Sequence, residues 1–197
     1  MDPITASPLA HGCPVLFLSY AHADALWKDR LLAHLGSLER RALLTVWEDS
    51  QIASGDDWHG DIDAAMDAAS LAIFLVSPAF LRSQFIQETE VPHLLARWEK
   101  RADGLRIYPI LAEPCDWELA SYLKRLQVRP SNVNGPTALS AGTSHEQAER
   151  LAAVAKEIRL LLAGIRPAEM KKGAPLRPED IAIARLPLTG EHVLGRD

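Results

Sequence analysis

The side chains that most often carry chemistry are spread thinly along this chain. Its seven histidines and two cysteines, Cys13 and Cys115, show no spacing typical of metal ligands. The sequence also lacks the Gly-x-Ser-x-Gly turn of serine hydrolases and a glycine-rich phosphate loop. We therefore expect no metal ion and no bound cofactor.

Two carboxylates, Glu88 and Glu90, stand two residues apart. On a helix such side chains project roughly 200° from one another, so only one of them can face a given pocket. Pro92 follows, and proline belongs in the first turn of a helix, which is consistent with a regular helix that starts near Glu90. The dipole of that helix would stabilise ionised Glu90. The same pattern is also typical of a solvated glutamate in a first helical turn.

Short apolar segments would position these residues. Each is a run of consecutive apolar side chains, which suits a strand buried on both faces of a sheet. The segments are Val15–Leu18, Leu43–Trp47, Leu71–Val76 and Ile107–Leu111. Because longer stretches of helical periodicity separate them, the sequence predicts an α/β fold, with helices on both faces of a parallel sheet.

The stretches between the strands carry apolar residues three or four positions apart, as one face of a helix requires. Asp24 is expected to cap the first of these helices. Its apolar stripe consists of Trp27, Leu31, Leu35 and Leu38. Similar stripes predict a second helix over Trp58–Ala69 and a third around Leu94–Trp98.

After the fourth strand the periodicity weakens. We expect a short helix over Trp117–Leu126 and a last edge strand near Leu126–Val128. The segment Ser131–Thr143 is rich in turn-forming residues and indicates a loop. Ser144 is then expected to cap a strong helix, with Gln147 completing a capping box.

The composition is typical of one globular domain with an appendage. The chain has 197 residues, of which 48% are hydrophobic and 24% charged. Its net charge of −5 gives no general attraction to nucleic acid or anionic lipid. No apolar run approaches the ~20 residues of a membrane-spanning helix. We expect a cytoplasmic protein that binds neither nucleic acid nor membrane.

Three blocks of sequence resemble a Toll/interleukin-1 receptor (TIR) domain of the bacterial kind. The first, Val15–Asp24, places a Ser-Tyr pair directly after a strand. The second, Trp47–Ile62, contains a glycine followed by an aromatic residue, and the third is Phe74–Val91. Together they cover nearly all of residues 13–165.

The resemblance implies a flavodoxin-like, doubly wound parallel sheet of order 2-1-3-4-5. Such sheets bind ligands beyond the carboxyl ends of strands 1 and 3, where the winding direction reverses. Those ends are Ser19-Tyr20 and Ser77-Pro78. The loop Ser50–Asp57 follows strand 2 and is expected to lie at the opening of the same crevice.

Many TIR domains cleave the bond between nicotinamide and ribose in NAD+ with a single glutamate, and the resemblance implies Glu90 for that role, with Glu88 as its rival. Departure of nicotinamide leaves an oxocarbenium-like ribose, which a carboxylate stabilises. The product is ADP-ribose or a cyclic isomer. The implied substrate-binding residues are Ser19, Tyr20, Ala21, Asp49, Trp58, Ser77 and Phe85. As alternatives, Ser19 and Ser77 would only end strands, while Trp58 and Asp49 would only brace the loop.

The expected organisation is a disordered leader (1–12), the TIR domain (13–165) and a linker (166–197). The segment Leu186–Asp197, with its final residues Val193–Asp197, resembles the start of the nucleotide-binding domain in NLR-like (STAND) signalling ATPases. This implies an effector domain that self-association with other TIR domains activates in bacterial anti-phage signalling. The alternative function is a non-catalytic TIR–TIR scaffold. A receiver-like flavodoxin fold ranks last, because the acidic cluster at the end of strand 1 is missing.

Overall fold

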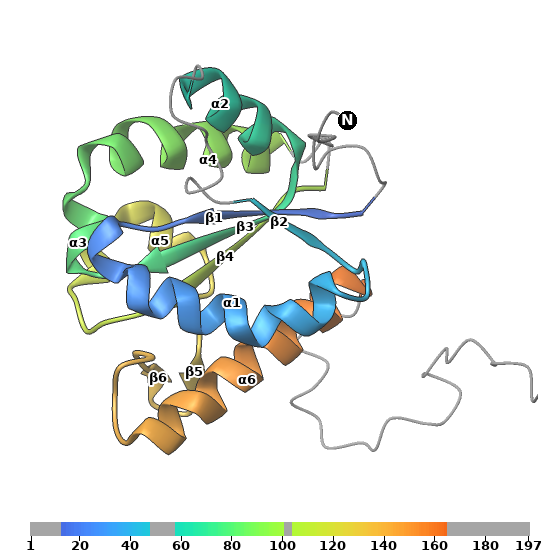
Figure 1. Ribbon diagram of the computed structural model, residues 1–197. Coiled ribbons are helices and arrows are strands. Elements are labelled where there is room, and N and C mark those ends of the chain that lie inside the picture. Colours follow the sequence, from blue (N-terminus) through green and yellow to red (C-terminus); the bar gives the residue numbers. More distant parts are fainter. Residues whose placement is uncertain (1–12, 48–57, 101–103, 165–197) are drawn as a thin grey trace, which may run out of the picture. The chain divides into compact units, whose positions relative to one another are not determined.

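A computed structural model describes residues 13–47, 58–100 and 104–164, and the backbone alone at residues 58 and 59. Its centre is a sheet of four parallel strands in the order β2-β1-β3-β4 (Figure 1). The strands are β1 (Val15–Ser19), β2 (Thr45–Trp47), β3 (Ala69–Val76) and β4 (Arg106–Leu111). All four coincide with predicted strands, and their order confirms the predicted winding.

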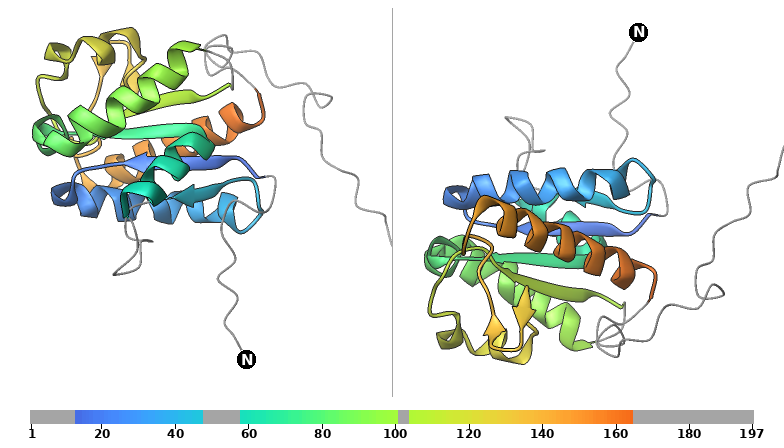
Figure 2. Two further views of the ribbon diagram at one scale, coloured as in Figure 1. Left: turned by 90° about the horizontal axis from the view of Figure 1, so that it is seen from above. Right: turned by 90° about the horizontal axis from the view of Figure 1, so that it is seen from below.

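Helices cover both faces of the sheet (Figure 2). One face carries α1 (Ala25–Glu39) and α6 (Ser144–Leu162), which lie side by side. The other carries α2 (Trp58–Ala68) and α4 (Val91–Lys100). The strands supply alternate side chains to the two layers. In β1, Leu16 and Leu18 pack on the α1 and α6 side, whereas Val15 and Phe17 pack on the other.

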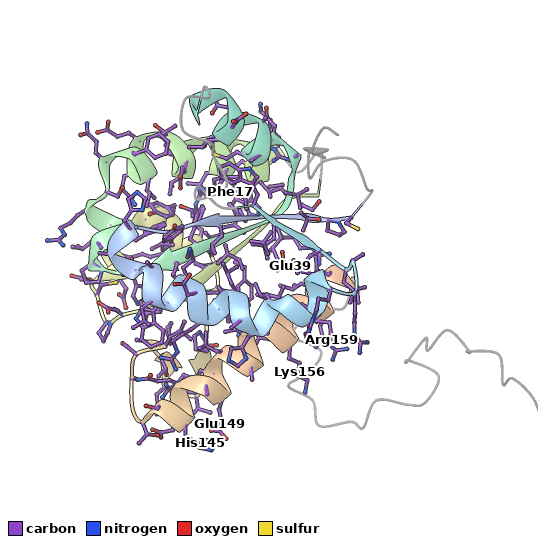
Figure 3. All side chains as sticks on the ribbon, in the orientation of Figure 1. Phe17, Glu39, His145, Glu149, Lys156 and Arg159 are labelled. Carbon is purple, nitrogen blue, oxygen red and sulfur yellow. The ribbon has the colours of Figure 1, made fainter. Side chains whose placement is uncertain are left out.

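The helices bury the apolar stripes that the sequence predicts. Trp27, Leu31, Leu35 and Leu38 of α1 are all buried. On the opposite face Phe17 stacks on Trp47, with ring centroids 5.1 Å apart. Side chains fill the space between sheet and helices, while Lys156 and Arg159 project from the outer surface of α6 (Figure 3). No helix in the described part of the chain is long and apolar enough to cross a membrane.

The predicted fifth strand is reduced to a bridge of one residue. Arg129 pairs with Ile110 of β4 through two backbone hydrogen bonds, one from its N–H to the Pro109 carbonyl and one from the Leu111 N–H to its own carbonyl. Pro109 turns its N–H-deficient nitrogen to this edge, and the Leu111 carbonyl accepts from the Leu139 N–H instead of from the chain that follows Arg129. The ladder therefore stops after one residue, and the prediction of a strand over Leu126–Val128 is wrong.

The segments on either side of this bridge also differ from the prediction. The expected short helix is divided into a 3-10 turn, η5 (Trp117–Leu119), and α5 (Ser121–Arg125). The expected loop contains a small antiparallel hairpin of β5 (Ser131–Asn132) and β6 (Gly135–Pro136).

The cap of α6 lies one residue earlier than predicted. Thr143 accepts a hydrogen bond from the Glu146 N–H, and the Glu146 side chain accepts one from the Thr143 N–H, so these two residues form the capping box. Gly142, with φ of 72°, makes the turn that brings Thr143 to the cap. Gln147 instead donates to the Ser140 carbonyl, at 2.8 Å.

Candidate functional site

Four buried polar side chains gather at the C-terminal edge of the sheet. Ser19 ends β1, and Ser77 directly follows β3. Asp24 ends the 3-10 turn η2 (His22–Asp24), and Glu90 ends the π-helical turn η4 (Ile86–Glu90). Their exposed fractions are 1% for Ser19, 0% for Ser77, 3% for Asp24 and 8% for Glu90. Since buried polar groups are costly unless they are paired, their pairing shows how the site is built.

Glu90 is held by the end of β1. The Ser19 Oγ donates a hydrogen bond to Glu90 Oε2, across 71 residues of sequence. Glu88 points to solvent instead, where Gln84 Nε2 donates to its Oε2 at 3.0 Å. Of the two candidate glutamates, the structure therefore turns Glu90 into the sheet edge and leaves Glu88 on the surface.

A π-helical turn sets the direction of Glu90. The Val91 N–H donates to the Ile86 carbonyl, five residues back, and the regular helix α4 begins at Val91. Pro92 follows and has no N–H to offer to the preceding turn. Such turns insert one residue into a helix and are frequent at functional sites.

The predicted effect of the helix dipole on Glu90 is not supported. The regular helix does begin beside Glu90, as Pro92 indicated, but the chain before it is already wound. The Gln87 N–H, for example, donates to the Ser83 carbonyl at 3.0 Å. Glu90 therefore lies inside a continuous helical segment, where the N-terminal partial charge of a helix does not act.

Asp24 and Ser77 form the second buried pair. The Ser77 Oγ donates to Asp24 Oδ2 at 2.5 Å. The same hydroxyl accepts from the N–H groups of Ala79, at 3.1 Å, and Phe80, at 3.0 Å, and so caps α3 (Pro78–Arg82). Ser77 is thus a buried helix cap, as the alternative of a strand-end serine describes, and its pocket-lining role stays a prediction.

Asp24 occupies the N-cap position of α1, as predicted, but its side chain makes no hydrogen bond to the start of that helix. Its carboxylate serves the neighbouring α3 cap instead. Burial raises the pKa of Asp24 above its usual value, the Ser77 hydrogen bond opposes this effect, and the charge of Glu113 adds to it. Sequence reasoning missed Asp24 as a member of this site. Its position just after the Ser-Tyr pair was the only available signal.

The other predicted site residues are distributed around this edge. Tyr20 is half-buried, and the Lys28 ammonium lies 5.3 Å from the centroid of its ring. Ala21 and Phe85 are half-buried and pack against the apolar layer beneath α2 and α4. Asp49 and the loop Ser50–Asp57 lie outside the described residues, as does the Trp58 side chain.

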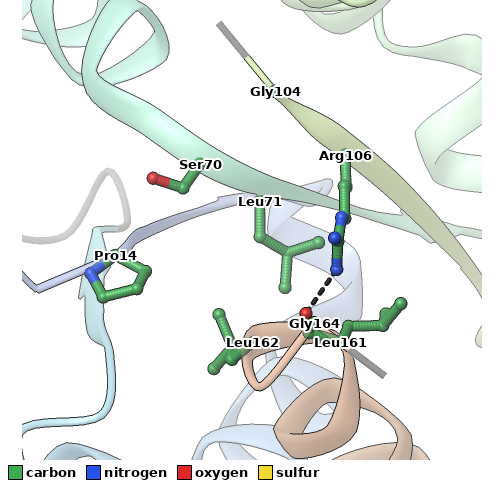
Figure 4. Close-up of a pocket in the computed structure, with 8 residues that line it drawn as sticks. All are labelled: Pro14, Ser70, Leu71, Gly104, Arg106, Leu161, Leu162 and Gly164. Atoms are coloured by element: carbon green, nitrogen blue, oxygen red, sulfur yellow. Dashed lines mark hydrogen bonds between the residues drawn. The ribbon is translucent and has the colours of Figure 1, made fainter. Parts of the chain in front are cut away.

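A hollow of about 160 Å³ opens at the opposite edge of the sheet (Figure 4). It is lined by Pro14, Ser70, Leu71, Gly104, Arg106, Leu161, Leu162 and Gly164. The Arg106 guanidinium donates to the Leu161 carbonyl there. None of these described lining residues carries a carboxylate, and the hollow adjoins the beginnings of β3 and β4, so it is not the crevice that the winding rule indicates. Within the described ranges no group of His, Cys, Asp and Glu side chains is arranged to hold a metal ion.

Comparison with known proteins gives three findings. A family model described as TIR domain matches residues 16–151. The chain is 31% identical over 111 residues to the uncharacterized protein y4lF of Sinorhizobium fredii (strain NBRC 101917 / NGR234), and the match covers 56% of this chain and 34% of that protein. The chain thus spans about a third of its relative. The crystal structure of the TIR domain of the Toll-related receptor TRR-2 from Hydra magnipapillata matches with a TM-score of 0.45 and 20% identity, over 73% of this chain and 97% of that chain.

Proposed function

The chain belongs to the TIR domain family of signalling modules, and on that premise we propose that it is an NAD+ glycohydrolase with Glu90 as its catalytic carboxylate. The TIR domain family includes NADases. The observation that carries the proposal is the inward position of Glu90, hydrogen-bonded by Ser19 at the edge where the strand winding reverses. A carboxylate held in this way is typical of a functional site.

The chemistry requires little beyond a fixed negative charge. The bond between ribose C1′ and the nicotinamide nitrogen breaks, and both electrons stay with nicotinamide, which leaves as a neutral molecule. The ribose that remains resembles an oxocarbenium ion, and ionised Glu90 stabilises its positive charge. The oxygen of a water molecule then bonds to C1′ and releases a proton, which gives ADP-ribose. Attack by an oxygen of the same nucleotide gives a cyclic isomer instead.

Ser19 would act on Glu90 rather than on the substrate. Its side chain is buried, and its hydroxyl donates to one carboxylate oxygen of Glu90. This hydrogen bond fixes the rotamer of Glu90. Tyr20, Ala21 and Phe85 are half-buried at the same edge and remain the candidates for contact with the substrate.

We further propose that assembly switches this activity on. TIR domains typically interact with other TIR domains, and the loop Ser50–Asp57 is the candidate for completing the site between neighbours. Residues 13–165 would be the effector domain of a longer cytoplasmic chain. Residues 166–197 would lead to a nucleotide-binding ATPase domain, because Val193–Asp197 resemble the start of one. The similar protein from Sinorhizobium fredii supports a bacterial setting, for which we propose anti-phage signalling.

The test measures the release of nicotinamide from NAD+ by the protein, either at high concentration or fused to an oligomeric carrier. We expect Glu90→Gln to lower turnover by about 100-fold or more, because the charge on the growing cation is lost. Glu88→Gln is the matched control and should keep full activity. Loss with Glu88→Gln alone would overturn the choice of Glu90. Absence of turnover in the assembled wild type would refute the proposed glycohydrolase activity and favour a TIR–TIR scaffold.

A further inference from the structure

Two side-chain hydrogen bonds, which we call polar bridges, connect the region at the end of β1 to the region that follows β3. Ser19, at the end of β1, reaches Glu90, and Asp24, five residues later, reaches Ser77 at the end of β3. Both bridges therefore join the segment that leaves β1 to the segment that leaves β3. Only the first contains the proposed catalytic group, and the second has no role in the chemistry.

We propose that Asp24 is a positioning residue, which acts through Ser77 to hold the ends of β1 and β3 in the arrangement that lets Ser19 meet Glu90. For its activity readout this inference rests on the proposed function. Its structural readout does not, because the bridge itself can be measured in a protein without activity.

The hydrogen-bonding capacity of Ser77 explains why an acid is suited to this position. A serine hydroxyl has one donor and two acceptor sites, and all three are used here. An ionised carboxylate can only accept, so Asp24 fixes the Ser77 proton on itself and leaves both lone pairs for Ala79 and Phe80. A neutral amide would form a weaker bond and could present its own N–H groups instead.

The surroundings of Asp24 do not favour its charge. It is almost fully buried, and burial is the main reason that its pKa is raised. The ionisable groups that interact with it, Glu113 and Cys115, come from the segment between β4 and η5, and neither carries a positive charge. An acid kept where it costs stability is a candidate for a functional role.

The experiment compares Asp24→Asn with Asp29→Asn, an exposed aspartate on α1 that serves as the matched control. In Asp24→Asn we expect hydrogen-exchange protection of the Ala79 and Phe80 amides to fall about tenfold. We also expect kcat of the assembled protein to fall about tenfold with KM unchanged, because the site is misaligned rather than blocked. Wild-type protection and kcat in Asp24→Asn would overturn the proposal.

The variant Ser77→Ala tests whether Asp24 acts through Ser77. If Asp24 acts through Ser77, the double variant Asp24→Asn/Ser77→Ala should lose no more kcat than the more damaging single variant. Losses that multiply would overturn the proposal. The wild type provides a test without mutation, since protection of Ala79 and Phe80 should fall as Asp24 becomes protonated.

Failure of the proposed function would be recognisable separately. Glu90→Gln should abolish turnover while leaving the Ala79 and Phe80 amides protected as in the wild type. If the wild type shows no turnover in any assembled form, the glycohydrolase proposal fails. The proposed role of the hydrogen bond between Asp24 and Ser77 is then tested by amide protection alone. Equal protection in the wild type and Asp24→Asn would refute it.

Discussion

Asp24 links the stability of the fold to pH. Its pKa is raised in the folded protein, so the folded state binds the proton more tightly than the unfolded state does. The resulting stabilisation is fully present below the unfolded pKa and is lost as pH rises through the folded pKa. We expect the free energy of unfolding of the wild type, relative to Asp24→Asn, to decrease as pH rises above 3.8, the ordinary pKa of an aspartate.

Urea denaturation of both proteins over a series of pH values measures this difference. Asp29→Asn, compared with the wild type in the same way, controls for the general effect of removing one negative charge. If the difference between the wild type and Asp24→Asn stays constant with pH, the raised pKa of Asp24 is contradicted.

Ser19→Ala should separate the hydroxyl from the carboxylate that it orients. The variant leaves Glu90 buried without this donor, which typically costs about 1–3 kcal/mol of the free energy of unfolding. We expect turnover of NAD+ to fall as well, because the rotamer of Glu90 is no longer fixed.

The matched control for Ser19→Ala is Ser70→Ala, a serine exposed on β3, which should change stability by less than about 0.5 kcal/mol. Denaturation and nicotinamide release provide the two measurements. A fully active and fully stable Ser19→Ala protein would show that the hydrogen bond to Glu90 has no role.

Single residues of the site could be predicted only where a local pattern identifies them. The spacing of Glu88 and Glu90 indicated that only one of them can face a given pocket, and the family resemblance favoured Glu90. The bridge from Asp24 to Ser77 spans 53 residues and depends on the finished sheet, so no local rule identifies it. Sequence rules likewise could not choose between neighbouring caps for α6, because Thr143 and Ser144 each have a suitable partner three residues later.

At the scale of elements, the π-helical turn before α4 can be tested through Pro92. In Pro92→Ala the new N–H can bond to a carbonyl of the preceding turn, and a regular α-helix then competes with the π turn. We expect Glu90 to rotate away from Ser19, so that turnover falls while the free energy of unfolding stays equal or rises. Nicotinamide release and denaturation measure the two effects.

Pro136→Ala, an exposed proline in the distant strand β6, is the control for Pro92→Ala and should change neither quantity. Retention of full turnover in Pro92→Ala would mean that the π turn does not set the direction of Glu90. A loss of both turnover and stability would contradict the expected competition between two helical registers.

The strands that could be predicted are those buried on both faces. Val15–Leu18 and Leu71–Val76 stand out as continuous apolar runs because each strand packs against helices on two sides. The fifth strand could not be predicted correctly, since its length depends on the edge of β4 to which the Pro109 nitrogen is turned. That direction is set by the pairing of β4 with β3 and not by the sequence near Val128.

At the scale of the whole molecule, the proposed switch predicts that activity depends on concentration. The described edge holds Glu90 and its bridges, while the loop proposed to complete the site would come from a neighbouring domain. If only the assembled form is competent, the apparent activity of a dilute chain is reduced by the small fraction that is assembled. Turnover of NAD+ per mole of protein should therefore rise with protein concentration until assembly is complete.

Nicotinamide release measured over a series of dilutions, together with the size distribution from light scattering at each dilution, provides the check. Glu90→Gln should assemble like the wild type but remain inactive at every concentration, which separates assembly from catalysis. Asp24→Asn should show the same concentration dependence as the wild type with a lower plateau, because its defect lies within each domain. Turnover per mole that stays constant while the particles change in size would refute activation by assembly and leave a glycohydrolase that is complete in one chain.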